Sequence, residues 1–81
     1  MIPRIDKAHW IQNHTLHVRF TDGTEGDVDL GRELDGEIFQ PLKDVEYFKK
    51  FNVHSELHTI TWPNGADFAP EFLYDRARVT A

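Results

Sequence analysis

An Asp-Gly pair between two runs of alternating side chains is the feature that most constrains the fold of this chain. Before the pair, residues 15–21 place apolar side chains on one face and polar side chains on the other, which is the period of a half-buried strand. Asp22-Gly23 predicts a tight turn, because Gly accepts a positive φ and Asp is the next best residue. Residues 24–30 return with the same period. We therefore expect an antiparallel hairpin.

The two faces of this hairpin differ in chemistry. The face that we expect to meet the core consists of Leu16, Val18, Phe20, Gly26, Val28 and Leu30. On the other face, the return strand carries Glu25, Asp27 and Asp29, spaced about 6.6–7 Å apart at two-residue steps. The alternation therefore predicts one buried surface and one acidic surface on the same strand.

The residues before the hairpin predict a further strand. Residues 4–11 contain β-branched and aromatic side chains and precede Asn13, a good turn former. A strand here completes a three-stranded antiparallel meander over residues 1–30.

The middle of the chain predicts a loop and then a helix. Residues 31–42 contain two Gly and one Pro and are expected to form a packed loop, with one helical turn at 32–34. Apolar side chains at three-residue spacing (Val45, Phe48, Phe51) predict a helix that begins at Lys43 or Asp44. Lys49 and Lys50 are placed in its last turn, where they complement the helix dipole.

The last third of the chain predicts a short hairpin and a C-terminal helix. Pro63-Asn64-Gly65 supplies a turn, and Pro70 suits the first position of a helix. The expected elements are short strands at 53–56, 59–62 and 66–68 and a helix from 70 to about 77.

Strands and helices are therefore segregated along the chain, which is typical of the α+β class. We expect a single domain over residues 1–81, with helices packed on one face of the sheet. The residues on the periodic faces should form one core: Phe20, Val28, Phe48, Ile60, Trp62 and Leu73.

Acidic residues are concentrated in one part of the sequence. The formal net charge is −5, and residues 22–37 hold seven acidic residues and one base, Arg32, a net −6. Such a patch repels nucleic acid backbones and attracts cations or basic proteins. It is either a solvated edge or a binding face. As a binding face it predicts a small basic protein as the partner, and no direct nucleic acid.

Residue types that carry common chemistries do not form their motifs. The chain has no Cys and no Gly-rich phosphate loop, and Ser55 lies outside any nucleophile elbow. Five histidines occur: His9, His14, His17, His54 and His58. They lack the spacing of a zinc-binding helix, and the acidic residues lack the EF-hand pattern. We expect a protein that is not an enzyme and has no cofactor and no metal.

The sequence also lacks a bilayer-spanning apolar run and the apolar stretch of a signal peptide. We expect a cytoplasmic protein that does not bind membranes. A homo-oligomer stays open.

The block over residues 60–74 reads as strand, turn, strand and helix start. Together with earlier segments, it resembles the domain-of-unknown-function 2442 family. The segments that carry the resemblance are Leu16–Gly23, Val28–Leu30, Phe39–Asp44, Phe48 and Trp62–Tyr74. The family pattern has a Gly-containing turn before the Ile-x-Trp strand, whereas this chain has Glu56, Leu57 and His58. The resemblance implies an α+β fold, no established enzymatic activity and an antitoxin-like role beside a second small protein.

Three residues of the last block have two readings. Trp62, Asp67 and Tyr74 either form a partner surface or support the fold. In the second reading Trp62 is core, Asp67 caps the helix or holds the turn, and the Tyr74 hydroxyl anchors the helix.

We interpret the chain as a non-enzymatic protein-binding module, the antitoxin-like member of a two-protein system. The expected partner-binding residues are Asp22, Glu25, Asp27, Asp29, Trp62, Asn64, Asp67 and Tyr74. The alternative is a small-molecule or metal-ion-binding domain.

Overall fold

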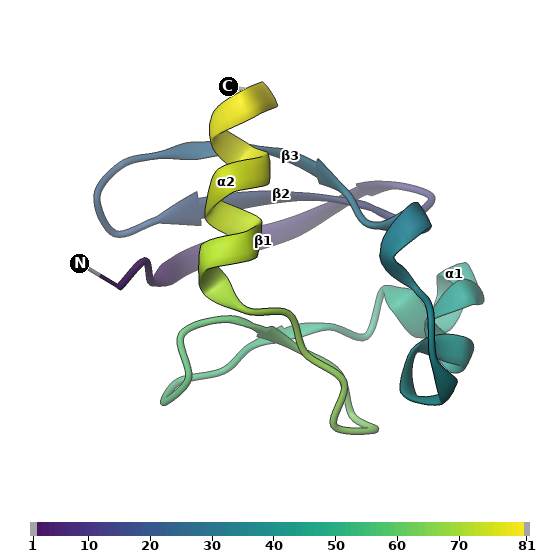
Figure 1. The fold of residues 1–81 in the computed structure, drawn as a ribbon. Helices are drawn as coiled ribbons and strands as arrows, with labels where there is room; N and C mark the ends of the chain where they lie inside the picture. Colours follow the sequence, from purple (N-terminus) through teal and green to yellow (C-terminus); the bar gives the residue numbers. More distant parts are fainter. Residues whose placement is uncertain (1, 81) are drawn as a thin grey trace.

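The computed structural model describes residues 2–80 and shows an α+β domain built on a three-stranded antiparallel sheet (Figure 1). Its strands are β1 (Ile5–Gln12), β2 (Thr15–Phe20) and β3 (Glu25–Asp29), in the order β1-β2-β3. A second, two-stranded sheet pairs β4 (Asn52–Val53) with β5 (Ile60–Thr61). The helices are α1 (Val45–Phe48) and α2 (Pro70–Thr80), with two 3-10 helices, η1 (Gly31–Glu33) and η2 (Glu37–Lys43). The predicted meander and fold class are confirmed.

The β2–β3 hairpin closes at the Asp-Gly pair, as the alternation predicted. The amide of Phe20 donates to the Thr24 carbonyl at 2.7 Å, and Gly23 takes a φ of 91°. This conformation is strained for residues with a Cβ atom. The turn fixes the register, so that His17 lies opposite Asp27 and Arg19 lies opposite Glu25.

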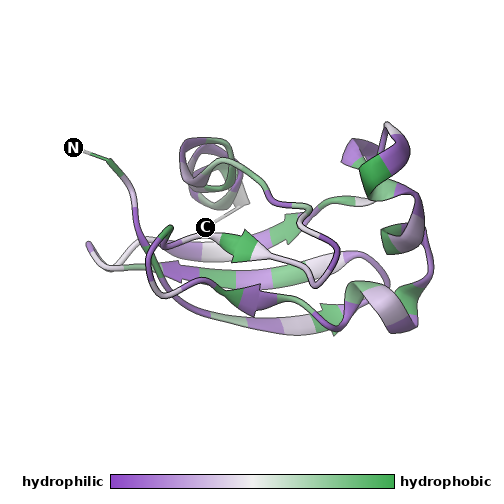
Figure 2. Cartoon of the chain, turned by 90° about the horizontal axis from the view of Figure 1, so that it is seen from below, coloured by the Kyte–Doolittle hydropathy of each residue, from purple (hydrophilic) through white to green (hydrophobic). Residues whose placement is uncertain are grey.

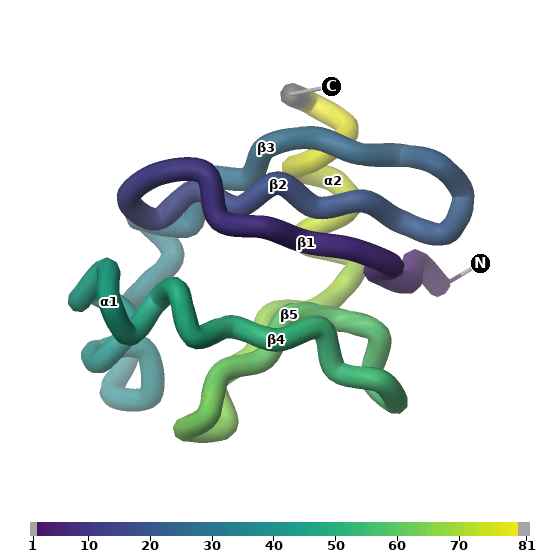
Figure 3. Tube along the Cα trace, turned by 180° about the vertical axis from the view of Figure 1, so that it is seen from behind, coloured from purple at the N-terminus to yellow at the C-terminus, as the bar shows by residue number. Residues whose placement is uncertain are grey.

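Helix α2 gives the sheet an inner and an outer face. It crosses the sheet on one side and packs mainly against β3 (Figure 1). Seen from behind, β1, β2 and β3 lie in front of α2, and no other described element covers this side of the sheet (Figure 3). The β4–β5 hairpin lies beyond β1, where the Ile5 amide donates to the His58 carbonyl at 2.8 Å. The sheet is therefore covered on one face only.

The core lies between the inner face, α2 and the β4–β5 hairpin. All six residues predicted from periodicity belong to one buried cluster: Phe20, Val28, Phe48, Ile60, Trp62 and Leu73. Hydrophobic and hydrophilic residues alternate along the strands, as half-buried strands require (Figure 2). The Trp62 indole N–H donates to the Phe48 carbonyl at 2.8 Å, which satisfies its polar atom inside the core.

The middle of the chain differs from its prediction. The packed loop is mostly helical, since η2 occupies Glu37–Lys43 and contains Pro41. The predicted helix is also shorter, because α1 ends at Phe48 and leaves Lys49 and Lys50 outside it. Asp44 caps α1 by accepting from the Glu46 amide at 3.1 Å. The chain leaves the helix early because residues 52 and 53 pair with β5.

The turn at residues 56–58, which contains no glycine, is held by two histidines. His58 takes a φ of 54°, a region that non-Gly residues seldom adopt. The His54 ring nitrogen Nδ1 accepts from the amides of Glu56 and Leu57, both at 3.1 Å. The strand predicted at 53–56 is therefore reduced to β4, and the strand predicted at 66–68 is reduced to a single bridge between Thr61 and Asp67.

The C-terminal helix begins at Pro70 as predicted but continues to Thr80. Leu73 and Ala77 form its buried side. Within residues 2–80, none of the helices has the length and apolar character needed to cross a membrane.

Candidate partner-binding surface

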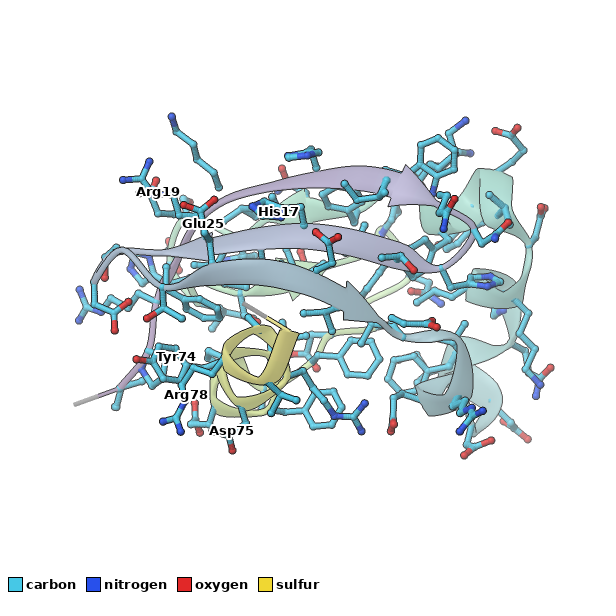
Figure 4. The ribbon with its side chains drawn as sticks, turned by 90° about the horizontal axis from the view of Figure 1, so that it is seen from above. His17, Arg19, Glu25, Tyr74, Asp75 and Arg78 are labelled. Atoms are coloured by element: carbon cyan, nitrogen blue, oxygen red, sulfur yellow. The ribbon has the colours of Figure 1, made fainter. Side chains whose placement is uncertain are left out.

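The outer face of the sheet is a polar surface whose rows follow from strand register. One row joins Lys7, Arg19 and Glu25, and the next joins His9, His17 and Asp27. The basic and imidazole side chains come from β1 and β2, whereas the carboxylates come from β3. His17, Arg19 and Glu25 lie on the side of the sheet opposite α2 (Figure 4). We call this surface the outer face.

His17 is held between two of the three carboxylates of β3. Its Nδ1 lies 2.8 Å from Asp27 Oδ1, and its Nε2 lies 2.9 Å from Glu25 Oε1. The ring of His9, on β1, packs against it at a centroid distance of 5.1 Å. The hydrogen bonds to Asp27 and then Glu25 raise the pKa of His17 above its ordinary value.

The raised pKa sets the direction of the pH dependence. Both contacts favour the imidazolium in the folded state, so they stabilise the fold fully below the pKa of an unfolded histidine. This stabilisation is lost as pH rises through the higher pKa of folded His17. Deprotonation of His17 therefore weakens the cluster on the alkaline side.

Asp22 and Tyr74 come together at the hairpin turn. The Tyr74 hydroxyl donates to Asp22 Oδ2 at 2.6 Å, and the Thr24 amide donates to Asp22 Oδ1 at 2.9 Å. These bonds, the one from Tyr74 first, lower the pKa of the Asp22 carboxyl. Tyr74 therefore anchors α2 to the hairpin through its hydroxyl. This is the second of the two roles considered for Tyr74, in which the residue supports the fold.

Two further acidic residues have internal partners. Asp29 Oδ1 accepts from the Gly31 amide at 2.9 Å, which shapes the exit from β3. Glu33 Oε1 lies 2.7 Å from Arg76 Nη2 on α2. Glu33 is thus engaged on the helix side and does not extend the acidic surface of β3.

The block over residues 60–74 does not form one surface with the β3 carboxylates. Trp62 is only 4% exposed and belongs to the core, so it is not accessible to a partner. Asn64 holds its own turn, because Oδ1 accepts from the Ala66 amide at 3.0 Å and Nδ2 donates to the Ile38 carbonyl at 2.8 Å. Asp67 is exposed and caps no helix within residues 2–80. The cap predicted for Asp67 is wrong, and Asn64 supplies the turn's hydrogen bonds.

His17 was not among the site residues predicted from the sequence, although the sequence contains a signal for its contacts. Once Asp22-Gly23 is taken as the centre of the hairpin, counting outward pairs His17 with Asp27 and Arg19 with Glu25. Opposite charges on neighbouring strands are favourable cross-strand pairs. Alternation alone identified the face of each residue but not its neighbour on the next strand.

The geometry gives no support to a metal site. Among residues 2–80, there is no group of three or more His, Cys, Asp or Glu side chains placed to hold a metal ion. The imidazole of His17 bridges the carboxylates of Glu25 and Asp27 instead.

The fold and its outer face define a small α+β domain with one sheet face packed and the other open. The chain belongs to the family described as protein of unknown function (DUF2442), which matches residues 5–79. Searches of curated proteins and of solved structures gave no match.

Proposed function

We propose that this chain is a non-enzymatic protein-binding module, the antitoxin-like member of a two-protein system, and that its outer face docks a basic protein. The observation that carries the proposal is the open sheet face opposite α2, on which Glu25 lies (Figure 4). Asp27 and Asp29 are exposed and follow Glu25 at two-residue steps, so alternation puts them on the same face of β3. A sheet face without a covering layer is where a second molecule can pack without displacing part of the fold.

The charge of the β3 carboxylates indicates which side chains the partner's surface should carry. Glu25, Asp27 and Asp29 are all exposed, and they lie within the segment that carries a net −6. Complementary charge across an interface raises the association rate and selects the partner, with a smaller effect on dissociation. A protein surface rich in Lys and Arg fits this face.

The test compares two variants with the same change in charge. One variant, Glu25→Gln/Asp27→Asn/Asp29→Asn, removes the carboxylates of the outer face. The control, Asp35→Asn/Glu37→Gln/Asp75→Asn, removes three exposed carboxylates from other elements. The tagged wild-type protein and the control should retain the same basic protein from a native lysate, and the outer-face variant should lose it.

A salt series with the captured protein then distinguishes electrostatic docking from non-specific binding. We expect the association rate to fall as ionic strength rises, because exposed charges are screened beyond about 8–10 Å. Equal capture by both triple variants, or an association rate independent of salt, would show that the carboxylates serve only solubility.

A further inference from the structure

Both ring nitrogens of His17 face carboxylate oxygens, and this geometry couples the two contacts to the charge of the ring. The two contacts measure 2.8 and 2.9 Å, within the range of hydrogen bonds. An ionised carboxylate only accepts, and a neutral imidazole has one N–H to donate. Both contacts are therefore hydrogen bonds only when His17 is an imidazolium, and loss of one proton must break one of them.

Charged groups surround His17 on all three strands. They are Lys7 and His9 on β1, Arg19 on β2 itself, and Glu25 and Asp27 on β3. Lys7 and Arg19 oppose a positive charge on the ring, as does His9 when protonated, whereas the two carboxylates favour it. The carboxylates touch the ring directly, and the balance raises the pKa of His17.

We propose that His17 is a protonation switch that controls how much negative charge the outer face offers to a partner. The inference rests on the proposed function, since it concerns the regulation of the same surface. With the imidazolium in place, Glu25, Asp27 and His17 together carry a charge of −1, and both carboxylates are engaged. After deprotonation the three groups carry −2, and one of the two hydrogen bonds to the ring is lost, which makes a carboxylate oxygen more accessible to another cation.

Linkage then sets the direction of the effect on binding. A basic partner competes with the imidazolium for the same oxygens, so it binds the deprotonated protein more tightly. By reciprocity, docking of the partner must displace the proton from His17. Binding should therefore strengthen from mildly acid to mildly alkaline solution, although the net charge of an arginine-rich partner stays constant.

The experiment uses octa-arginine as the basic probe and compares wild type with His17→Gln. Affinity is measured at one fixed, low ionic strength, below and above the ordinary histidine pKa, at about pH 6 and about pH 9. For wild type we expect binding about fivefold tighter at the higher pH, which is the effect of one charge at contact distance in water. Calorimetry in buffers of different ionisation enthalpy should show proton release on binding near neutral pH.

The matched control separates His17 from the other groups that titrate in this range. His17→Gln should lose most of the pH dependence and most of the proton release seen with wild type. His58→Asn, which removes a histidine ring from the β4–β5 turn and supplies a residue that accepts its positive φ, should keep the pH dependence of wild type. Nitrogen chemical shifts of the His17 ring should show two N–H groups at the lower pH and one at the higher pH.

Three results would overturn the switch. They are equal wild-type affinities at both pH values, a pH dependence in His17→Gln as large as that of wild type, and no binding of the peptide at either pH. None of these results would exclude a protein partner that binds wild type and does not bind the outer-face variant. The switch and the proposed function can thus fail separately.

Discussion

The two faces of strand β2 show how one segment meets two different requirements. Its inner residues, Leu16, Val18 and Phe20, are at most 1% exposed and pack against the core. Its outer residues alternate with them, and His17 and Arg19 face the charged groups of β1 and β3. Volume and shape constrain the inner face, because a packed interior does not tolerate gaps. The outer face has no such packing constraint, and its cross-strand contacts join charged groups.

The largest expected effect compares two neighbouring residues on these faces. Phe20→Ala removes a buried ring that contacts the Tyr74 ring edge-on at a centroid distance of 5.0 Å. We expect a loss of about 3–5 kcal/mol of unfolding free energy, typical of a large cavity. Arg19→Ala removes an exposed side chain, and a change within about 0.5 kcal/mol is expected. Denaturant unfolding of both variants measures the difference.

The contrast between the two faces is wrong if the two substitutions lower the free energy of unfolding by similar amounts. A loss of more than about 1.5 kcal/mol for Arg19→Ala would show that the outer face contributes to the fold as well as to binding. A small loss for Phe20→Ala would place the core elsewhere. Chemical denaturation suits the test, because a loss of this size is a large part of the roughly 5–15 kcal/mol typical of a domain.

The inner face could be predicted because its signal is local and periodic. Alternation over residues 15–30 located Phe20 and Val28 in the core, and the spacing around Phe48 did the same for α1. The turns at Gly23 and Gly65 were also predictable, because Gly accepts a positive φ, and both residues take a φ of 91°. In each case the residue type and the local conformation agree.

The remaining features depend on contacts between distant residues. The early end of α1 follows from β4–β5 pairing, which the Val45–Phe51 spacing does not contain. η2 lacks a periodic pattern, and distant residues hold it in place. Leu42 is buried in the core, the Phe39 ring stacks on Phe68, and Asn64 donates to the Ile38 carbonyl. The His17 cluster required knowledge of which residues lie opposite one another. Side-chain partners across strands are therefore the part of the site that alternation leaves undetermined.

The second prediction concerns the contact between the charged hairpin turn and the helix that covers the inner face. Tyr74→Phe keeps the ring against Phe20 but removes the hydroxyl that donates to Asp22. We expect the melting temperature at neutral pH to fall by a few degrees. Because this bond lowers the pKa of Asp22, its stabilisation is present above the ordinary carboxyl pKa and is lost as pH falls through the lowered value.

Melting curves of wild type and Tyr74→Phe should therefore converge in acid. A difference that persists at low pH would assign the effect to the other bond of the hydroxyl, which accepts from the Thr24 hydroxyl at 3.3 Å, and not to the Asp22 carboxylate. In that case Thr24, and not Asp22, would join the hairpin turn to the helix.

The smallest expected effect concerns Asp67, an exposed acidic residue that lies away from the β3 carboxylates. Asp67→Ala should change the unfolding free energy by less than about 0.5 kcal/mol, because its side chain supplies no cap. Asn64→Ala is the matched control in the same turn. It removes the bonds to Ala66 and to the Ile38 carbonyl and should cost about 1–2 kcal/mol.

Binding of the captured partner decides what the Asp67 result means for the two faces. If the outer face alone docks the partner, Asp67→Ala should leave affinity unchanged while the outer-face triple variant loses it. Full stability together with lost binding would extend the interface to the turn after Trp62, on a different part of the molecule. A cost above about 1 kcal/mol would instead reveal a structural role for this carboxylate. Unfolding and affinity measured on the same variant therefore distinguish a contact residue, a fold residue and a neutral one.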